Sequence, residues 1–363
     1  MNLSIQTPTL LLDRYRCLVN IDHMIAKAKR HNISLRPHFK THQSRTIGQW
    51  YAQRGVEKIT VSSVAMAEYF ASDWSDITIA FPTNILELKR IEQLTEQVQI
   101  NVLVESLEVA IYLKENLKQH VGVFIKIDVG YGRTGIAAEN LSLIQSLVTT
   151  LENANNLDFK GFLAHAGHTY QCRSKMCIEQ THALSLKRMQ TLKEHFINHP
   201  RPLEYSYGDT PSCSVAEDFT GMTELRPGNF VFYDLTQRAI GSNAYENIAV
   251  AMACPIVALH RERQEVVVYG GGVHFSKDRL EHPDYGTIFG RVVVQTETGW
   301  GEVIPDAYVR SLSQEHGIIR LPKALMAQQR IGDFIFVLPV HSCMAANLQT
   351  SYLTTEGEWI ERL

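Results

Sequence analysis

Two kinds of hydrophobic pattern alternate along the first two-thirds of the chain. Short runs rich in Val, Ile and Phe are typical of strands, while segments such as SLEVAIYLKENLKQ carry apolar residues at the three-and-four spacing of an amphipathic helix. Strands separated by such helices are the pattern of a (β/α)8 barrel. The predicted strands lie near 34–39, 58–63, 76–81, 100–105, 121–129, 159–165, 203–208 and 224–233.

A doubly wound open sheet is the alternative arrangement for alternating strands and helices. That fold commonly carries a GxGxxG motif directly after its first strand, where the motif holds a dinucleotide. No such motif follows the predicted strand at 34–39. The barrel is therefore the favoured prediction.

The pattern changes after about residue 235. Helical periodicity fades, and β-rich runs bounded by turns follow one another, among them EVVVYGGGV and GDFIFVLPVHSC. The fold class predicted is α/β, with an N-terminal barrel over 12–235. A mostly β C-terminal domain is predicted to comprise 236–363 together with residues 1–11.

Charge and cysteine content narrow the classes of partner. The 363 residues carry 35 basic and 38 acidic side chains, a net charge of −3, so no global positive field favours nucleic acid. No run of 18 apolar residues predicts a membrane span, and the first residues do not resemble a signal peptide. Six cysteines at irregular spacings without a CxxC pair argue against a disulfide framework. We expect a cytoplasmic protein without nucleic-acid or membrane partners.

The segment SLRPHFKTHQS (34–44) places basic side chains at alternate positions. On a strand, Arg36, His38, Lys40 and His42 share one face, where burying unpaired cations is costly. These basic side chains are therefore expected to contact either carboxylates inside the protein or an anionic ligand. The first alternative stays open for Arg36. Other cations and desolvation are expected to lower the pKa of Lys40, and a neutral amine is what Schiff-base chemistry requires.

Polar residues also follow several other predicted strands. In a (β/α)8 barrel the loops after the strands build the active site, so these endings are expected to converge. In YGDTPS, backbone N–H groups and a Thr hydroxyl suit a phosphate group. The endings are IDVGYGRTG (127–135), AHAGHTY (164–170), YGDTPS (207–212) and RPGNFVFYD (226–234).

The segment GDFIFVLPVHSC predicts a strand that ends in two possible metal ligands. Residues two apart on a strand face the same way, which would bring His341 and Cys343 together. An imidazole and a thiolate suit Zn²⁺, whereas a thiolate disfavours Mg²⁺ or Ca²⁺. A bare HxC pair is a weak signal by itself.

In their order along the chain, these motifs resemble the D-serine dehydratase and D-threonine aldolase family, enzymes of the alanine-racemase fold type that use pyridoxal phosphate. The resemblance implies that Lys40 is the Schiff-base lysine and that His341 and Cys343 bind Zn²⁺ or another divalent metal. It is carried by TPTLLLD (7–13), RPHFKTHQS (36–44), IDVGYGRTG (127–135), AHAGHTY (164–170), GDTPS (208–212), RPGNFVFYD (226–234), SQEHG (313–317) and GDFIFVLPVHSC (332–343).

The resemblance also implies a set of cofactor contacts. Arg133 would be the partner of the pyridine nitrogen, and Gly208 and Thr210 would contact the phosphate. Asp209 departs from the family, which usually has a small or hydroxyl residue there. A carboxylate beside a phosphate dianion is unfavourable unless its side chain turns away. The full set of implied cofactor contacts is Lys40, His38, Arg133, His165, Tyr170, Gly208, Asp209, Thr210 and Tyr233.

The activity expected is a β-elimination that converts a D-β-hydroxy amino acid, such as D-serine, into a 2-oxo acid and ammonia. The alternative is a D-threonine aldolase, which releases glycine and an aldehyde; Cys343 favours elimination, because aldolases of the family tend to have Asp as the second ligand. Two further alternatives are a racemase, for which Tyr308 is a conceivable second base, and a non-catalytic protein that binds the cofactor. The resemblance also implies a homodimer.

Overall fold

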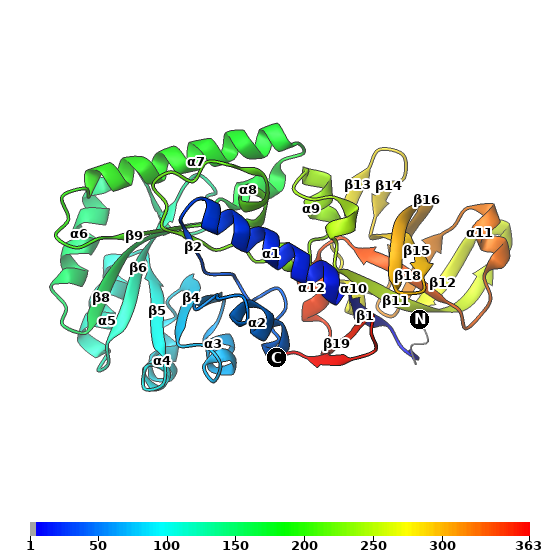
Figure 1. Ribbon diagram of the computed structural model, residues 1–363, viewed down its shortest axis with the longest axis horizontal. Coiled ribbons are helices and arrows are strands. Elements are labelled where there is room, and N and C mark those ends of the chain that lie inside the picture. The colour runs from blue at the N-terminus through cyan, green and yellow to red at the C-terminus, as the bar shows by residue number, and fades with distance from the viewer. Residues whose placement is uncertain (1–4) are drawn as a thin grey trace. The chain divides into compact units, whose positions relative to one another are not determined.

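The computed structural model describes residues 5–363 and divides them into two compact units (Figure 1). The barrel unit comprises 22–40 and 48–228, and the β-rich unit comprises 5–21, 41–47 and 229–363. The predicted boundary at 235/236 therefore differs from this division, which assigns 12–21, 41–47 and 229–235 to the β-rich unit. Residues 1–4, which the prediction assigned to the C-terminal domain, lie outside the described residues.

The barrel unit is built on a ring of parallel strands, as predicted. Backbone pairing runs in the order β2-β10-β9-β8-β6-β5-β4-β3, and a bridge between His38 and Thr60 joins the two ends. Short β7 (Ile136–Ala137) pairs with β6. The ring strands are β2 (Ser34–Leu35), β3 (Ile59–Val61), β4 (Asp76–Pro82), β5 (Gln99–Val104), β6 (Val121–Asp128), β8 (Leu157–Ala164), β9 (Glu204–Tyr207) and β10 (Glu224–Leu225).

The first and last ring strands are much shorter than the sequence pattern predicts. Pro37 follows β2 and Pro227 follows β10, and proline cannot donate to a sheet ladder. The backbone still pairs locally beyond β2, since the His38 N–H donates to the Pro227 carbonyl at 2.9 Å. The chain is therefore already turning when it reaches Lys40.

Amphipathic helices cover the outer face of the ring, as the apolar periodicity predicts (Figure 1). Several begin at a serine that accepts a backbone N–H, as Ser106 and Ser174 do. The helices are α1 (Arg14–Arg30), α2 (Arg45–Ala52), α3 (Val64–Phe70), α4 (Leu88–Thr95), α5 (Leu107–Asn116), α6 (Leu141–Glu152), α7 (Lys175–His195) and α8 (Thr210–Val215), with 3₁₀ turns η1 (Ile85–Glu87) and η2 (Gly167–Gln171).

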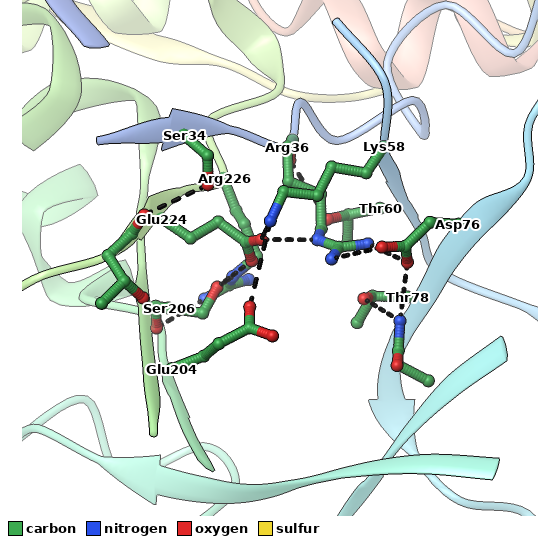
Figure 2. Close-up of polar contacts among 12 residues, drawn as sticks. Ser34, Arg36, Lys58, Thr60, Asp76, Thr78, Glu204, Ser206, Glu224 and Arg226 are labelled. Carbon is green, nitrogen blue, oxygen red and sulfur yellow. Dashed lines mark hydrogen bonds and ion pairs between the residues drawn. The ribbon is translucent and has the colours of Figure 1, made fainter. Parts of the chain in front are cut away.

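Part of the ring interior is filled by charged side chains rather than by an apolar layer. The guanidinium of Arg36, 2% exposed, lies between the carboxylates of Glu224 and Asp76, at 2.7 and 2.6 Å (Figure 2). Lys58 reaches Glu224 at 2.8 Å. Arg36 is thus satisfied internally by carboxylates and does not face a ligand. Another part of the barrel unit is apolar, where Leu103, Phe124 and Leu163 pack together.

The β-rich unit contains a mostly antiparallel sheet. Strand β11 (Val250–His260) pairs with β12 and β18 through its two halves, which closes a ring of six strands, and β1, β19 and β20 extend the sheet. The other elements are β1 (Thr9–Leu12), β12 (Glu265–Tyr269), β13 (Leu280–His282), β14 (Gly286–Ile288), β15 (Gly290–Thr296), β16 (Gly299–Leu312), β17 (His316–Arg320), β18 (Phe334–Pro339), β19 (Ser351–Thr354), β20 (Trp359–Glu361), α9 (Leu235–Ile240), α10 (Gly272–Phe275), α11 (Lys323–Gln328), α12 (Ser342–Asn347), η3 (Asn229–Val231), η4 (Tyr245–Asn247) and η5 (Arg261–Arg263).

No helix among residues 5–363 has the length and apolar content needed to cross a membrane. One cysteine prediction requires correction, because Cys172 and Cys177 form a disulfide. Cys172 follows η2 and Cys177 lies in the first turn of α7, and the intervening turn brings their Cα atoms to 5.5 Å. Irregular spacing in the sequence could not reveal this approach.

Candidate functional site

Lys40 follows a segment of backbone that the barrel unit holds firmly. The N–H of Phe39 donates to the Thr60 carbonyl at 2.8 Å, and the Phe39 ring is fully buried. The rings of Phe70 and Trp74 pack edge-on against it with centroids 5.1 and 5.2 Å away. The backbone of Lys40 is thereby positioned, while its side chain is exposed. The predicted row on one strand face ends here, because Phe39–His42 form a turn and His42 is buried in the β-rich unit.

Two imidazoles lie close enough to Lys40 for its charge to affect them. Burial, followed by the charge of Lys40, holds the pKa of both His38 and His165 well below the usual range. Both rings are therefore neutral near pH 7. The desolvation expected for Lys40 does not apply to its exposed side chain, and the lowered pKa predicted for this lysine stays a prediction.

Hydrogen bonds define the tautomers of these two rings. The backbone N–H of Lys40 donates to Nδ1 of His38 at 3.3 Å, so the proton of the neutral ring is on Nε2. Nδ1 of His165 lies 2.8 Å from the Gly208 carbonyl, which can only accept, so Nδ1 carries the proton. His38 consequently offers a donor at Nε2 and His165 offers an acceptor at Nε2.

Three further cations collect at the ends of the barrel strands. Burial and the charges of Arg226 and Arg133 lower the pKa of Lys126 to about 7. Arg226 is 5% exposed, and its Nε donates to Ser206 Oγ at 2.6 Å. Sequence reasoning missed Lys126 and Arg226, although each is a charged residue beside an apolar strand. An excess of positive charge at one end of the barrel favours an anionic ligand.

Arg133 lies on a loop whose backbone N–H groups are bound by the carboxylates of Asp128 and Glu105. Oδ1 of Asp128 accepts the N–H groups of Gly130 and Tyr131 at 2.9 and 2.8 Å. The exposed Arg133 guanidinium lies 5.0 Å from the centre of the Tyr131 ring, a cation–π contact. That Arg133 is the partner of the pyridine nitrogen stays a prediction.

Tyr170 belongs to the same group of rings. Its ring centroid is 6.5 Å from that of His165, and the ring of Tyr131 lies 6.0 Å from His165 on an edge-on approach. The structure therefore brings His165, Tyr170 and the Arg133 loop together, as the sequence analysis expected.

The segment Gly208–Thr210 combines close backbone approach with unpartnered polar atoms. A Cβ on Gly208 would lie 2.7 Å from the backbone nitrogen of Arg226, so only glycine fits there. The side-chain oxygens Asp209 Oδ2 and Thr210 Oγ1 are buried and have no hydrogen-bond partner. A buried polar atom without a partner costs about 1–3 kcal/mol, which a bound ligand can recover.

The second group of predicted residues lies in the β-rich unit. Strand β18 ends at Pro339, so the prediction that His341 and Cys343 share a strand face is wrong. His341 is the residue preceding α12 and Cys343 lies in the first turn of that helix. The turn nevertheless brings their side chains into hydrogen-bonding contact.

Surrounding polar groups orient both side chains. Nδ1 of His341 lies 3.3 Å from Oδ2 of Asp278. Sγ of Cys343 lies 3.3 Å from the Thr41 hydroxyl and 3.4 Å from the Asn229 amide nitrogen. Because an amide nitrogen can only donate, the sulfur is the acceptor in this contact. Sequence reasoning missed Asp278, Thr41 and Asn229, which only the fold brings to this place.

The donor set suits a metal only in part. Without a metal, burial lowers the pKa of His341 but hydrogen bonds to Asp278 and Cys343 outweigh it and raise the pKa to about 11. Within residues 5–363, no cluster of three or more His, Cys, Asp or Glu side chains is arranged to hold a metal ion. His341 and Cys343 could supply two ligands of the kind Zn²⁺ accepts.

Tyr233, the remaining predicted cofactor contact, is buried in the β-rich unit with a positive φ of 49°. Lys40, His38 and Thr210 belong to the barrel unit. That these residues form one site with Tyr233, His341 and Cys343 stays a prediction.

Comparison with known proteins finds two family models that match successive parts of the chain. Residues 13–235 match the alanine racemase N-terminal domain, and residues 249–355 match the family described as "Putative serine dehydratase domain". A D-serine dehydratase of Dictyostelium discoideum is 28% identical over 378 residues, which cover 96% of this chain and 93% of the relative. A D-threonine aldolase of Arthrobacter sp. is 24% identical over 370 residues, covering 98% and 91%.

The D-threo-3-hydroxyaspartate dehydratase of Delftia sp. HT23 is similar in sequence and structure. It is 27% identical over 359 residues, which cover 94% of this chain and 92% of the relative. Its solved structure has a TM-score of 0.91 over 99% of this chain and 98% of that chain, at 26% identity. A cysteine-to-alanine variant of it, solved in the metal-free form, also has a TM-score of 0.91, at 25% identity and the same coverage. With an alanine racemase domain over most of its length and a serine dehydratase domain after it, the chain belongs to the D-serine dehydratase and D-threonine aldolase family of the alanine-racemase fold.

Proposed function

We propose that the protein is a pyridoxal-phosphate-dependent lyase that converts a D-β-hydroxy amino acid such as D-serine into a 2-oxo acid and ammonia. The observation that carries this proposal is the environment of Lys40. An exposed amine lies beside two neutral imidazoles, His38 and His165, at the end of a barrel strand. Relatives named dehydratases support an elimination.

The barrel unit has groups that fit a phosphorylated aldehyde. The side chain of Lys40 is exposed and carries the amine that reacts with an aldehyde, and the unpartnered Thr210 hydroxyl and the Arg226 charge suit a phosphate. When bound, the cofactor supplies an electron sink for the charge left on Cα after a proton is lost. The residues that would hold it are Lys40, His38, Arg133, His165, Tyr170, Gly208, Asp209, Thr210 and, from the β-rich unit, Tyr233.

Within this chain, Lys40 is the group suited to take the α-proton. Its amine is flexible enough to leave the aldehyde carbon and act as a base at Cα. The neutral rings of His38 and His165 add no positive charge beside it. The Nε2–H of His38 can donate to an anionic oxygen of a bound molecule.

His341 and Cys343 would hold a divalent metal, with water or substrate completing its shell. A metal held there would supply a Lewis acid for the departure of the β-hydroxyl. Asp278 accepts the Nδ1 proton of His341, which leaves Nε2 for the metal, an arrangement common among metal-binding histidines. The proposal requires this pair to face the same substrate as Lys40.

The second candidate is a D-threonine aldolase, which a relative in Arthrobacter supports. There the metal would hold the hydroxyl while a base removes its proton, and the Cα–Cβ bond would break. The family resemblance connects a Cys at position 343 with elimination, so dehydration is the first choice. A homodimer in the cytoplasm remains part of the proposal.

Product analysis separates the candidates. Purified protein with added pyridoxal phosphate and Zn²⁺ is incubated with D-serine and D-threonine, and pyruvate, 2-oxobutyrate, ammonia and glycine are measured. Elimination predicts 2-oxo acids and equimolar ammonia without glycine. Glycine with acetaldehyde from D-threonine would instead establish the aldolase, and L-serine formed from D-serine would establish racemisation. An absorbance band of the bound cofactor that no D-amino acid alters would show binding without catalysis.

A further inference from the structure

We propose that the carboxyl group of Asp209 carries a proton when the phosphate of the cofactor is bound, and that its Oδ2 donates this proton in a hydrogen bond to the phosphate. This inference rests on the proposed function, since it assumes that pyridoxal phosphate is the ligand. It predicts that the chain binds the phosphorylated cofactor more tightly below pH 6 than above it, relative to a variant that cannot ionise at this position.

The two carboxylate oxygens of Asp209 have very different surroundings. Oδ1 accepts the Ser212 N–H at 2.7 Å and the Thr169 hydroxyl at 2.8 Å. Oδ2 is buried without any partner, and the side chain is 2% exposed. The two bonds to Oδ1 fix the orientation of the carboxyl group and therefore the position of Oδ2.

The next residue, Thr210, also has a side-chain oxygen without a hydrogen-bond partner. Thr210 is 1% exposed, and its Oγ1 is also buried without a partner. Two adjacent side chains thus hold unsatisfied oxygens, and Gly208 before them has no room for a side chain. A hydroxyl can donate to a phosphate oxygen, whereas an ionised carboxylate can only accept and repels a phosphate anion. A protonated carboxyl removes this conflict and supplies a second donor.

The charges around Asp209 leave it poorly compensated. Arg226, at the end of β10, is the cation that acts on it, and Arg226 is itself engaged by Ser206. The other titratable groups are neutral near pH 7: Tyr207 on β9 and Cys213 on α8 have raised pKa values, and His165 after β8 faces the Gly208 carbonyl with a lowered one. Burial accordingly raises the pKa of Asp209 to about 6.

The test compares cofactor affinity between pH 5.5 and 8.5. Apoprotein of the wild type and of Asp209→Asn is titrated with pyridoxal phosphate, and bound cofactor is measured by absorbance and by equilibrium dialysis. Asn keeps an acceptor for Ser212 and offers a permanent donor in place of Oδ2. The wild type is expected to lose at least about tenfold in affinity over this range relative to Asp209→Asn, since holding a proton costs about tenfold per pH unit above the pKa.

Two comparisons test whether the phosphate group causes the pH dependence of cofactor affinity. Pyridoxal, which lacks the phosphate, is expected to bind both proteins with the same pH dependence. Thr210→Val removes the neighbouring donor and is expected to weaken pyridoxal phosphate by a similar factor at both pH values. Asp209→Ser provides a second non-ionising variant, in case Asp209→Asn does not fold, which a thermal melt would report.

The outcomes distinguish the two levels of the proposal. Equal pH dependence of affinity in the wild type and both Asp209 variants would overturn the inference while leaving the proposed function intact. Weaker binding by Asp209→Asn at both pH values would also overturn it. If neither pyridoxal phosphate nor pyridoxal binds and borohydride fixes no cofactor on Lys40, the proposed function itself fails.

Discussion

Arg36 and Glu224 form an ion pair inside the barrel unit, with Nε and Oε2 2.7 Å apart and both side chains at most 2% exposed. Asp76 engages the other end of the guanidinium at 2.6 Å. Arg36 precedes Lys40 by four residues, whereas Glu224 lies on β10; Figure 2 shows the two side chains facing each other. The network therefore stabilises the first barrel strand and supplies no group to the chemistry.

Replacing Arg36 with Met is expected to destabilise the barrel unit strongly. Removing Arg36 leaves the carboxylate of Asp76 without this ion pair and leaves Glu224 with Lys58 alone, a loss of about 3–5 kcal/mol. Urea denaturation followed by circular dichroism measures it. The matched control is Arg90→Met, since Arg90 pairs with Glu68 at 2.6 Å on the surface, where about 0–1 kcal/mol is expected. Similar losses in both variants would contradict the assignment.

Asp209 is expected to make the stability of the apoprotein fall as the pH rises. Its pKa in the folded chain is raised to about 6 from a usual 3.8, so the folded state holds a proton that the unfolded state releases. The loss of stability is absent below about pH 4 and reaches its full size above pH 6 to 7. A shift of two pKa units corresponds to about 3 kcal/mol in the free energy of unfolding. Asp209→Asn should therefore be more stable than the wild type at pH 8 and equal to it at pH 4.

Exposed Asp218 is the control, because its pKa is shifted in the opposite direction to that of Asp209. Hydrogen bonds from Thr220 lower the pKa of exposed Asp218, so its contribution to stability is present at neutral pH and disappears in acid. Asp218→Asn should accordingly be no more stable than the wild type at pH 8. A gain in both variants would indicate that removal of any negative charge is sufficient.

Lys40→Ala is expected to abolish covalent attachment of the cofactor and to lower activity by about 10²–10⁴-fold or more, because it removes both the amine and the base. Borohydride reduction followed by peptide mass spectrometry should find the label on Lys40 in the wild type. Lys114→Ala, at an exposed position of α5, is the control and should leave both properties unchanged. A label on Lys126 would assign the attachment to the other lysine.

Asp278→Asn is expected to weaken metal binding by about 10–100-fold, because the carboxylate orients His341 through Nδ1. Metal affinity is measured by competition with a chromophoric chelator. Asp284→Asn is the matched control, since Asp284 also lies beside a histidine, 3.8 Å from Nδ1 of His282, but on an exposed turn. Equal affinity of Asp278→Asn and the wild type would remove Asp278 from the metal site.

The class of fold could be predicted because its signals are local. Apolar periodicity reports which segments become strands and helices, so the ring strands and α5 and α7 were expected. The motifs around Lys40, Arg133 and Thr210 are contiguous in sequence, and each follows a strand. The carboxyl ends of barrel strands lie at one face, which brings such motifs together.

What only the tertiary structure decided is which side chains compensate one another. Arg36 finds its carboxylates on β4 and after residue 220, and no spacing in the sequence encodes those pairings. His341 and Cys343 meet through a helical turn rather than a strand face, and the Cys172–Cys177 bridge depends on how one loop folds back. Burial and partners arise from the packed chain, so the pKa values of Asp209 and His165 could not be derived from residue order.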